Sequence, residues 1–165
     1  MDLQQLLTSF EQYYTIKTEQ VLPPFAAEAE FHSHTEHYLL VRAAQIAESE
    51  SHEFVFFAEE KELTPERFTA LCNKAWETGL KRVKPHFGLR NADVVLIILA
   101  QQVATRVWSA AQKTNYFKSH CFYLHGLSHF KVLIYQTSSG KTACNRYAQD
   151  LEKLIQKINT QKETI

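Results

Sequence analysis

The feature that most constrains this chain is the apolar run at residues 92–100, Ala-Asp-Val-Val-Leu-Ile-Ile-Leu-Ala. The run is rich in β-branched residues and contains neither Gly nor Pro. A strand with one exposed face alternates apolar and polar side chains, whereas a strand covered on both faces is apolar throughout. We therefore expect residues 92–100 to form a central strand of a sheet, with the side chains of residues 94–99 buried on both faces.

The segments around this strand predict an α+β fold. Apolar residues spaced three and four apart predict helices, and alternation of apolar and polar residues predicts strands. In chain order the expected elements are a helix at 3–14, strands at 25–34, 38–47 and 53–58, a helix that begins after the cap residue Thr64, the strand at 92–100, a helix at 105–118, strands at 121–125, 130–136 and 141–145, and a helix at 147–158. These elements predict a mixed, mainly antiparallel sheet of about six strands flanked by helices, in the order αβββαβαβββα. Short polar links between the first three strands favour an antiparallel meander.

Length and composition predict a single domain over residues 1–165, with residues 159–165 frayed. The chain has 18 basic and 18 acidic residues and a formal net charge of zero. A protein that binds nucleic acid or membrane surfaces in general is more basic, so we expect neither partner. Three widely spaced cysteines without a Cys-x-x-Cys pair favour reduced thiols, and the first residues do not resemble a signal peptide. We therefore expect a cytoplasmic protein.

A group of histidines near the first expected strand is a candidate metal site. His32 and His34 share a face with Glu28 and Glu30, and His37 follows a Thr-Glu link that could place it across from His34. Imidazoles in such an arrangement can bind one metal ion. The alternative is a solvated face of a hairpin, and we favour it because two histidines on one face leave the third ligand unassigned.

The order αβββαβ resembles the core of the PD-(D/E)xK nuclease superfamily. That resemblance implies an acidic residue on the second strand and Glu-x-Lys on the third, which together bind Mg²⁺ and position a water. Glu59 and Lys61 supply Glu-x-Lys just after the third expected strand. The second expected strand has no acidic residue, and the nearest, Glu48, follows it. This departure argues against an active nuclease and favours a charged loop before Thr64.

Three further patterns have structural explanations. Ser139-Gly140-Lys141-Thr142 ends like a phosphate-binding loop, but it lacks the earlier glycine and the following helix that such a loop needs. Basic residues around Pro85 are explained by the negative end of the preceding helix dipole. The cysteines are expected to be small core residues, and the late histidines to be hydrogen-bonded structural groups. These residues are Cys72, Cys121 and Cys144, and His120, His125 and His129.

Several segments in the second half of the chain look like a family of uncharacterised proteins from Gram-positive bacteria. They lie at residues 117–126, 131–135 and 142–146. The resemblance implies a bacterial cytoplasmic protein and brings no catalytic residue with it. We therefore predict a non-catalytic cytoplasmic binding or interaction protein without a cofactor, and leave open whether it is a homodimer. The alternative is a metal-dependent phosphodiesterase or nuclease that uses Mg²⁺.

Overall fold

The computed structural model describes residues 1–33 and 50–160, and it has the predicted α+β fold. The helices are α1 (Leu3–Phe10), α2 (Pro65–Arg82), α3 (Thr105–Lys113), a 3₁₀ helix η1 (Arg146–Ala148) and α4 (Gln149–Thr160). The strands are β1 (Thr15–Lys17), β2 (Ala27–Ser33), β3 (Glu50–Leu63), β4 (Leu89–Val103), β5 (Phe117–Ser119), β6 (Leu127–Gln136) and β7 (Thr142–Cys144).

The strands form one mixed sheet in the order β1-β2-β3-β4-β6-β5, and β7 pairs with β6. Neighbours β3 and β4 are parallel, as are β4 and β6, whereas β1, β2, β5 and β7 join the sheet by antiparallel pairing. Because parallel neighbours need a crossover, α2 connects β3 to β4 and α3 lies between β4 and β6 in the chain. The three central strands therefore begin at the same end of the sheet.

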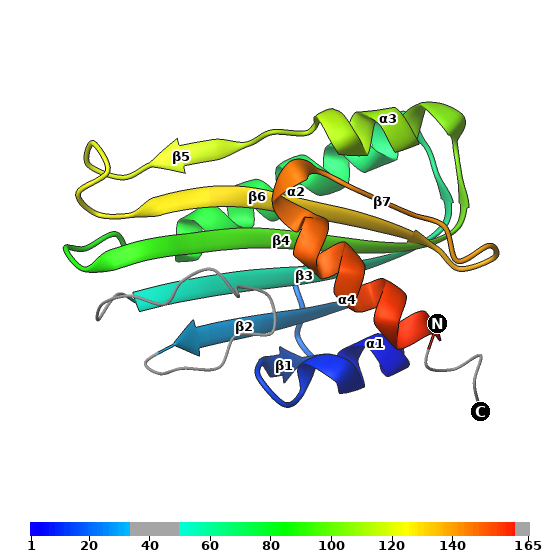
Figure 1. Ribbon diagram of the computed structural model, residues 1–165, viewed down its shortest axis with the longest axis horizontal. Helices are drawn as coiled ribbons and strands as arrows, with labels where there is room; N and C mark the ends of the chain where they lie inside the picture. The colour runs from blue at the N-terminus through cyan, green and yellow to red at the C-terminus, as the bar shows by residue number, and fades with distance from the viewer. Residues whose placement is uncertain (34–49, 161–165) are drawn as a thin grey trace.

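The helices cover both faces of the sheet. Side chains of α2 and α3 pack with one set of strand residues, which includes Phe56, Leu96 and Val132. Side chains of α1 and α4 pack with the opposite set, which includes Phe57, Ile97 and Leu133. Figure 1 shows α4 crossing in front of the sheet and α2 behind it. The prediction of a doubly buried central strand is confirmed, because residues 94–99 all lie within β4 and are buried.

Local sequence explains where α2 begins and how closely it approaches the sheet. Thr64 accepts a hydrogen bond from the backbone N–H of Arg67 and Pro65 takes the first helical position, as predicted. Near the other end of α2, a Cβ atom built on Gly79 would lie 2.4 Å from a methyl carbon of Val94. Gly79 therefore lets the helix approach β4 more closely than any residue with a side chain could.

The first three expected strands are partly wrong. Strand β2 pairs directly with β3, so the meander with residues 38–47 between them is wrong; residues 38–47 themselves lie outside the described part of the chain. Strand β1, at Thr15–Lys17, was not predicted. Strand β3 continues to Leu63, so residues 59–62 belong to a strand and not to a charged loop.

The segment after α3 also differs from its prediction. Helix α3 ends at Lys113, where we expected the helix to continue to residue 118. Phe117 lies instead in the short edge strand β5, with 44% of its surface exposed. Residues 121–125 form a turn and not a strand. At the C-terminal side, Asn159 and Thr160 belong to α4, and Asn159 accepts a hydrogen bond from the Tyr135 hydroxyl. None of the described helices is both long and apolar enough to cross a membrane.

Candidate functional site

The candidate histidine site is described only in part. His32 lies in β2 with its backbone opposite His52 of β3, a neighbour that the sequence did not suggest. His34 and His37 lie outside the described residues. Glu28, which we grouped with a solvated face, is instead buried and forms an ion pair with Arg82 of α2 at 2.7 Å. Within residues 1–33 and 50–160, no three His, Cys, Asp or Glu side chains are grouped to hold a metal ion.

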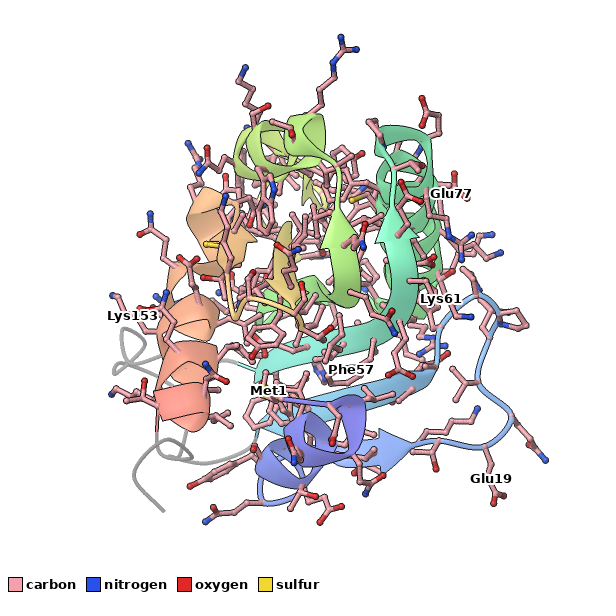
Figure 2. All side chains as sticks on the ribbon, turned by 90° about the vertical axis from the view of Figure 1, so that its right-hand side faces the viewer. Met1, Glu19, Phe57, Lys61, Glu77 and Lys153 are labelled. Carbon is pink, nitrogen blue, oxygen red and sulfur yellow. The ribbon has the colours of Figure 1, made fainter. Side chains whose placement is uncertain are left out.

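Two of the three candidate nuclease residues, Glu59 and Lys61, lie near the C-terminal end of β3. Glu59 and Lys61 are both exposed, and Glu48 lies outside the described residues. Figure 2 looks onto this end of the molecule and labels Lys61. Glu60, which lies between Glu59 and Lys61 in the chain, forms an ion pair with Arg67 of α2 at 2.7 Å. In the described part of the chain, neither Glu59 nor any other acid belongs to a group of three or more His, Cys, Asp or Glu side chains that could hold a metal ion.

A cluster of buried ionic groups lies at the other end of the central strands, and the sequence did not suggest it. The cluster consists of Glu53 of β3, Asp93 of β4, Lys131 and His129 of β6, and Tyr14 after α1; all but His129 are buried. Glu53 pairs with Asp93 in the register of β3 and β4. Because side chains alternate along a strand, the acids and Lys131 share the face that α1 and α4 cover farther along.

Lys131 joins the two carboxylates of this ion cluster. Its ammonium Nζ donates to Glu53 Oε1 at 2.5 Å and lies 3.0 Å from Asp93 Oδ2. The hydroxyl of Tyr14 donates to Glu53 Oε2 at 2.6 Å. Asp93 Oδ1 accepts the backbone N–H of His129 at 3.1 Å and lies 3.3 Å from its ring Nδ1. Every carboxylate oxygen of the cluster thus has a donor within the cluster.

The surroundings fix the charge states of these groups. Burial alone would raise the pKa of Asp93, but the hydrogen bonds and charges of His129 and Lys131 outweigh it and hold this pKa below its ordinary value. Burial alone would lower the pKa of Lys131, but the charges of Glu53 and Asp93 outweigh it and raise this pKa. Burial and the Glu53 charge raise the pKa of Tyr14 far above its ordinary value, so the phenol remains protonated.

A second feature of the same end of the sheet is an exposed apolar surface on two loops. We define the loop end as residues 83–88, between α2 and β4, and residues 120–126, between β5 and β6. Phe87 is 84% exposed, Phe122 is 91% exposed, and Tyr123 and Leu124 are also largely exposed. A Cβ atom on Gly126 would lie 2.9 Å from the backbone oxygen of Leu89, so the second loop packs closely against the first residue of β4, which directly follows the first loop. They form the left-hand tip of the molecule in Figure 1.

The backbone of the second loop is strained. Cys121, Phe122 and Tyr123 have φ angles of 48°, 49° and 73°, in the left-handed region that favours glycine. Each such residue with a side chain costs about 1–2 kcal/mol. Cys121 is exposed, so the expectation that all three cysteines are core residues is wrong for Cys121. Cys72 is buried as expected, and burial raises the pKa of its thiol to about 12.

The charged residues beside the loop end are mostly cationic. Lys84, Arg90 and Lys118 are exposed, and no acidic residue occurs in residues 83–92 or 114–128. Of the basic residues around Pro85, Arg82 forms an ion pair with Glu28. The guanidinium carbon of Arg82 lies 5.1 Å from the centre of the Phe56 ring. His86 pairs with Glu50, the first residue of β3, at 2.9 Å.

The chain matches one family model, which is described as Domain of unknown function (DUF8052), over residues 2–157. No curated protein and no solved structure matches it. The family match covers nearly the whole chain and brings no activity or site residue with it.

Proposed function

The chain belongs to the DUF8052 family, and we propose that it is a non-catalytic binding protein that meets its partner through the loop end. The observation that carries this proposal is the exposure of Phe87 and Phe122, at 84% and 91%. Single exposed apolar residues are ordinary, but several gathered on adjoining loops of one end are typical of an interaction site. The three free cysteines support a cytoplasmic location for this binding.

The backbone of the loop end supports the same proposal. Three consecutive residues with positive φ hold Phe122 and Tyr123 out from the sheet, at a cost in stability that the exposed side chains do not recover by packing. Strained backbone that persists on a surface is often associated with function. A loop selected for stability alone would have glycine at these positions.

The ion cluster supports a binding role over a catalytic one. A general base or a metal ligand needs a carboxylate oxygen that can accept a proton or a metal ion. The oxygens of Glu53 and Asp93 instead accept from Lys131, Tyr14 and His129, and the ammonium of Lys131 lies between the two acids. We interpret the cluster as a fixed cross-link of the three central strands, whose starts carry the loops.

Cys121 makes this proposal testable, because it places an exposed thiol inside the loop end. A fluorophore sensitive to polarity would be attached to Cys121 in a Cys144→Ser background, where Cys72 remains buried. The labelled protein would be titrated with lipid vesicles, with single-stranded RNA and with unlabelled protein. We expect a blue shift with one of these partners, and no shift with any of them would contradict the binding role.

A pair of variants ties the response to the loop end. Phe122→Ser combined with Phe87→Ser should abolish binding and leave the thermal midpoint of unfolding near that of the parent protein, because both side chains are almost fully exposed. Leu22→Ser is the matched control, since Leu22 is an exposed apolar residue outside the loop end. Equal loss of binding in the control would show that the loop end is not the contact surface.

A further inference from the structure

We propose that the partner of the loop end is an anionic membrane surface, which Phe122, Tyr123 and Phe87 enter while nearby cations contact the lipid headgroups. This inference rests on the proposed binding function and names its partner. It differs from the expectation drawn from net charge, because a net charge of zero averages over the whole molecule. The charge beside the loop end is not zero.

The protrusion of the apolar side chains favours a fluid partner. Anchors in protein interfaces are held in well-packed pockets at the centre of a contact. A side chain that is 91% exposed, as Phe122 is, touches almost nothing of its own protein and lines no groove for a peptide. The headgroup and acyl boundary of a bilayer needs no preformed pocket, because lipids rearrange around an inserted ring.

The charges select an anionic surface. Lys84, Arg90 and Lys118 are exposed beside the apolar tips, and the segments that carry them hold no acidic residue. Glu50, at the start of β3, pairs with His86 of the first loop. A cation near an anionic bilayer strengthens binding by roughly fivefold. Three cations together with inserted rings provide the two kinds of contact that stable attachment to a membrane needs.

The same observations argue against the other partners. A second copy of the chain would bring an equally basic loop end face to face with the first, and like charges would repel. Single-stranded nucleic acid stacks on rings that present one face and are supported on the other. The Phe122 ring is 91% exposed and therefore lacks the support on one face that such a platform needs.

The orientation on the membrane follows from the sheet. Both loops precede central strands, β4 and β6, and these strands are parallel. The molecule would therefore stand with the starts of these strands toward the bilayer and with Lys61, at the far end, away from it (Figure 2). Apolar insertion is confined to the loop tips, because residues 94–99 of β4 are buried.

Co-sedimentation with vesicles tests this inference. The protein would be mixed with vesicles of phosphatidylcholine and phosphatidylserine, and with vesicles of phosphatidylcholine alone. We expect binding to the mixed vesicles, a blue shift of the Cys121 fluorophore there, and weakening at high salt because salt screens headgroup contacts. Equal binding to both vesicle types would overturn the anionic part of the inference.

Two sets of variants separate the apolar and charged contributions. Lys84→Gln, Arg90→Gln and Lys118→Gln should each weaken partitioning by roughly fivefold, whereas Lys74→Gln, an exposed lysine on α2, should not change it. Phe122→Ser with Tyr123→Ser should weaken partitioning by at least about tenfold. Unchanged binding in the loop variants would show that the vesicles are held elsewhere on the molecule.

The outcomes distinguish this inference from the function on which it rests. A fluorophore shift with single-stranded RNA, or with unlabelled protein, and none with vesicles would overturn the membrane partner and keep the binding role. No shift with vesicles, RNA or unlabelled protein would overturn both.

Discussion

At the scale of single residues, the ion cluster depends on one ammonium group. Lys131 separates the carboxylates of Glu53 and Asp93, which β3 and β4 hold in register on one face of the sheet. Removing one partner of a buried ion pair costs far more than the pair contributes, because the remaining charge has no compensation. Lys131 is therefore the most sensitive position of the cluster.

We expect Lys131→Met to lower the free energy of unfolding by about 3–5 kcal/mol near neutral pH. The substitution keeps an unbranched side chain that is one atom shorter, and it removes the charge between the two acids. Chemical denaturation followed by circular dichroism would measure the change. The control is Lys153→Met, which breaks an exposed pair with Asp150 and should cost about 0–1 kcal/mol. Similar losses in both variants would mean that the cluster contributes no more than a surface pair.

The depressed pKa of Asp93 predicts an acid-dependent loss of stability. In the unfolded chain an aspartate has a pKa of about 3.9, and in the folded protein this value is lower. The contribution of Asp93 is therefore complete above the unfolded pKa and disappears as the pH falls through the folded pKa. We expect unfolding free energy to fall more steeply on acidification in the parent protein than in Asp93→Asn. The exposed-site variant Asp150→Asn should follow the parent, and a parent-like slope in Asp93→Asn would refute the assignment.

At the scale of elements, the sequence predicted those whose side-chain pattern is uniform. The apolar run at 92–100 and the cap at Thr64 lie where the structure has β4 and the start of α2. The prediction of a strand at 121–125 was wrong. The sequence Cys-Phe-Tyr-Leu-His has side chains that favour a strand, whereas its backbone turns through positive φ angles. Propensity describes what a residue prefers, and this loop holds residues against their preference.

The ion cluster also escaped prediction, for a physical reason. Glu53, Asp93 and Lys131 each lie near the start of a buried strand, as the charged residue immediately before an apolar run. A single charged residue of this kind has an ordinary explanation, because the end of a strand is often exposed to water. Only the order of the sheet, in which β3, β4 and β6 are neighbours and parallel, brings all three together. A charged residue directly before the apolar run in each of three strands, two acidic and one basic, is the signal that could have indicated the cluster.

The close approach of α2 to β4 predicts a destabilising Gly79→Ala substitution. Alanine would ordinarily stabilise a helix by about 1 kcal/mol over glycine. Here its methyl group would overlap the side chain of Val94, and crowding of a packed core costs about 1–3 kcal/mol. We expect a net loss of stability in thermal unfolding. In the double variant with Val94→Ala the overlap is relieved. The loss of stability in the double variant should therefore be smaller than the sum of the losses in the two single variants. A loss equal to that sum would contradict the contact.

The left-handed turn predicts a stabilising substitution at Phe122. We expect Phe122→Gly to raise the free energy of unfolding by about 1 kcal/mol, because glycine adopts a φ of 49° without strain and the phenyl ring packs against little. Phe87→Gly is the control, since Phe87 is similarly exposed and is not among the residues with positive φ. A gain in both variants, or in neither, would show that the turn is not strained.

At the scale of the whole molecule, the two ends of the sheet differ in chemistry. The starts of β3, β4 and β6 carry the ion cluster and the loop end, and the end of β3 carries Glu59 and Lys61. Glu59 lies six residues beyond Glu53, which is about 20 Å along a strand. The acids of the cluster therefore cannot serve as partners of Glu59 and Lys61 in a metal site.

This separation predicts that the protein does not cleave DNA or RNA in the presence of Mg²⁺. Two-metal and one-metal phosphodiesterases need carboxylates that converge on the ion. Purified protein would be incubated with plasmid DNA and with RNA, with and without Mg²⁺, and the products separated on gels. The nuclease alternative would be restored if the parent protein cleaved nucleic acid and both Glu59→Ala and Lys61→Ala abolished this cleavage. The control variant Glu62→Ala would have to retain it.

The parallel arrangement of the central strands has a consequence for the order of events in folding. The ion cluster joins Asp93 to His129 across 36 positions of the chain, and Glu53 to Lys131 across 78. Such distant contacts must overcome the entropy of closing long loops before they form, and chains dominated by them fold slowly. A contact that forms after the rate-limiting step affects the rate of unfolding and leaves the rate of folding nearly unchanged. If the ion cluster forms after that step, the buried ammonium controls the lifetime of the folded state. Lys131→Met should then increase the rate of unfolding and leave the rate of folding nearly unchanged.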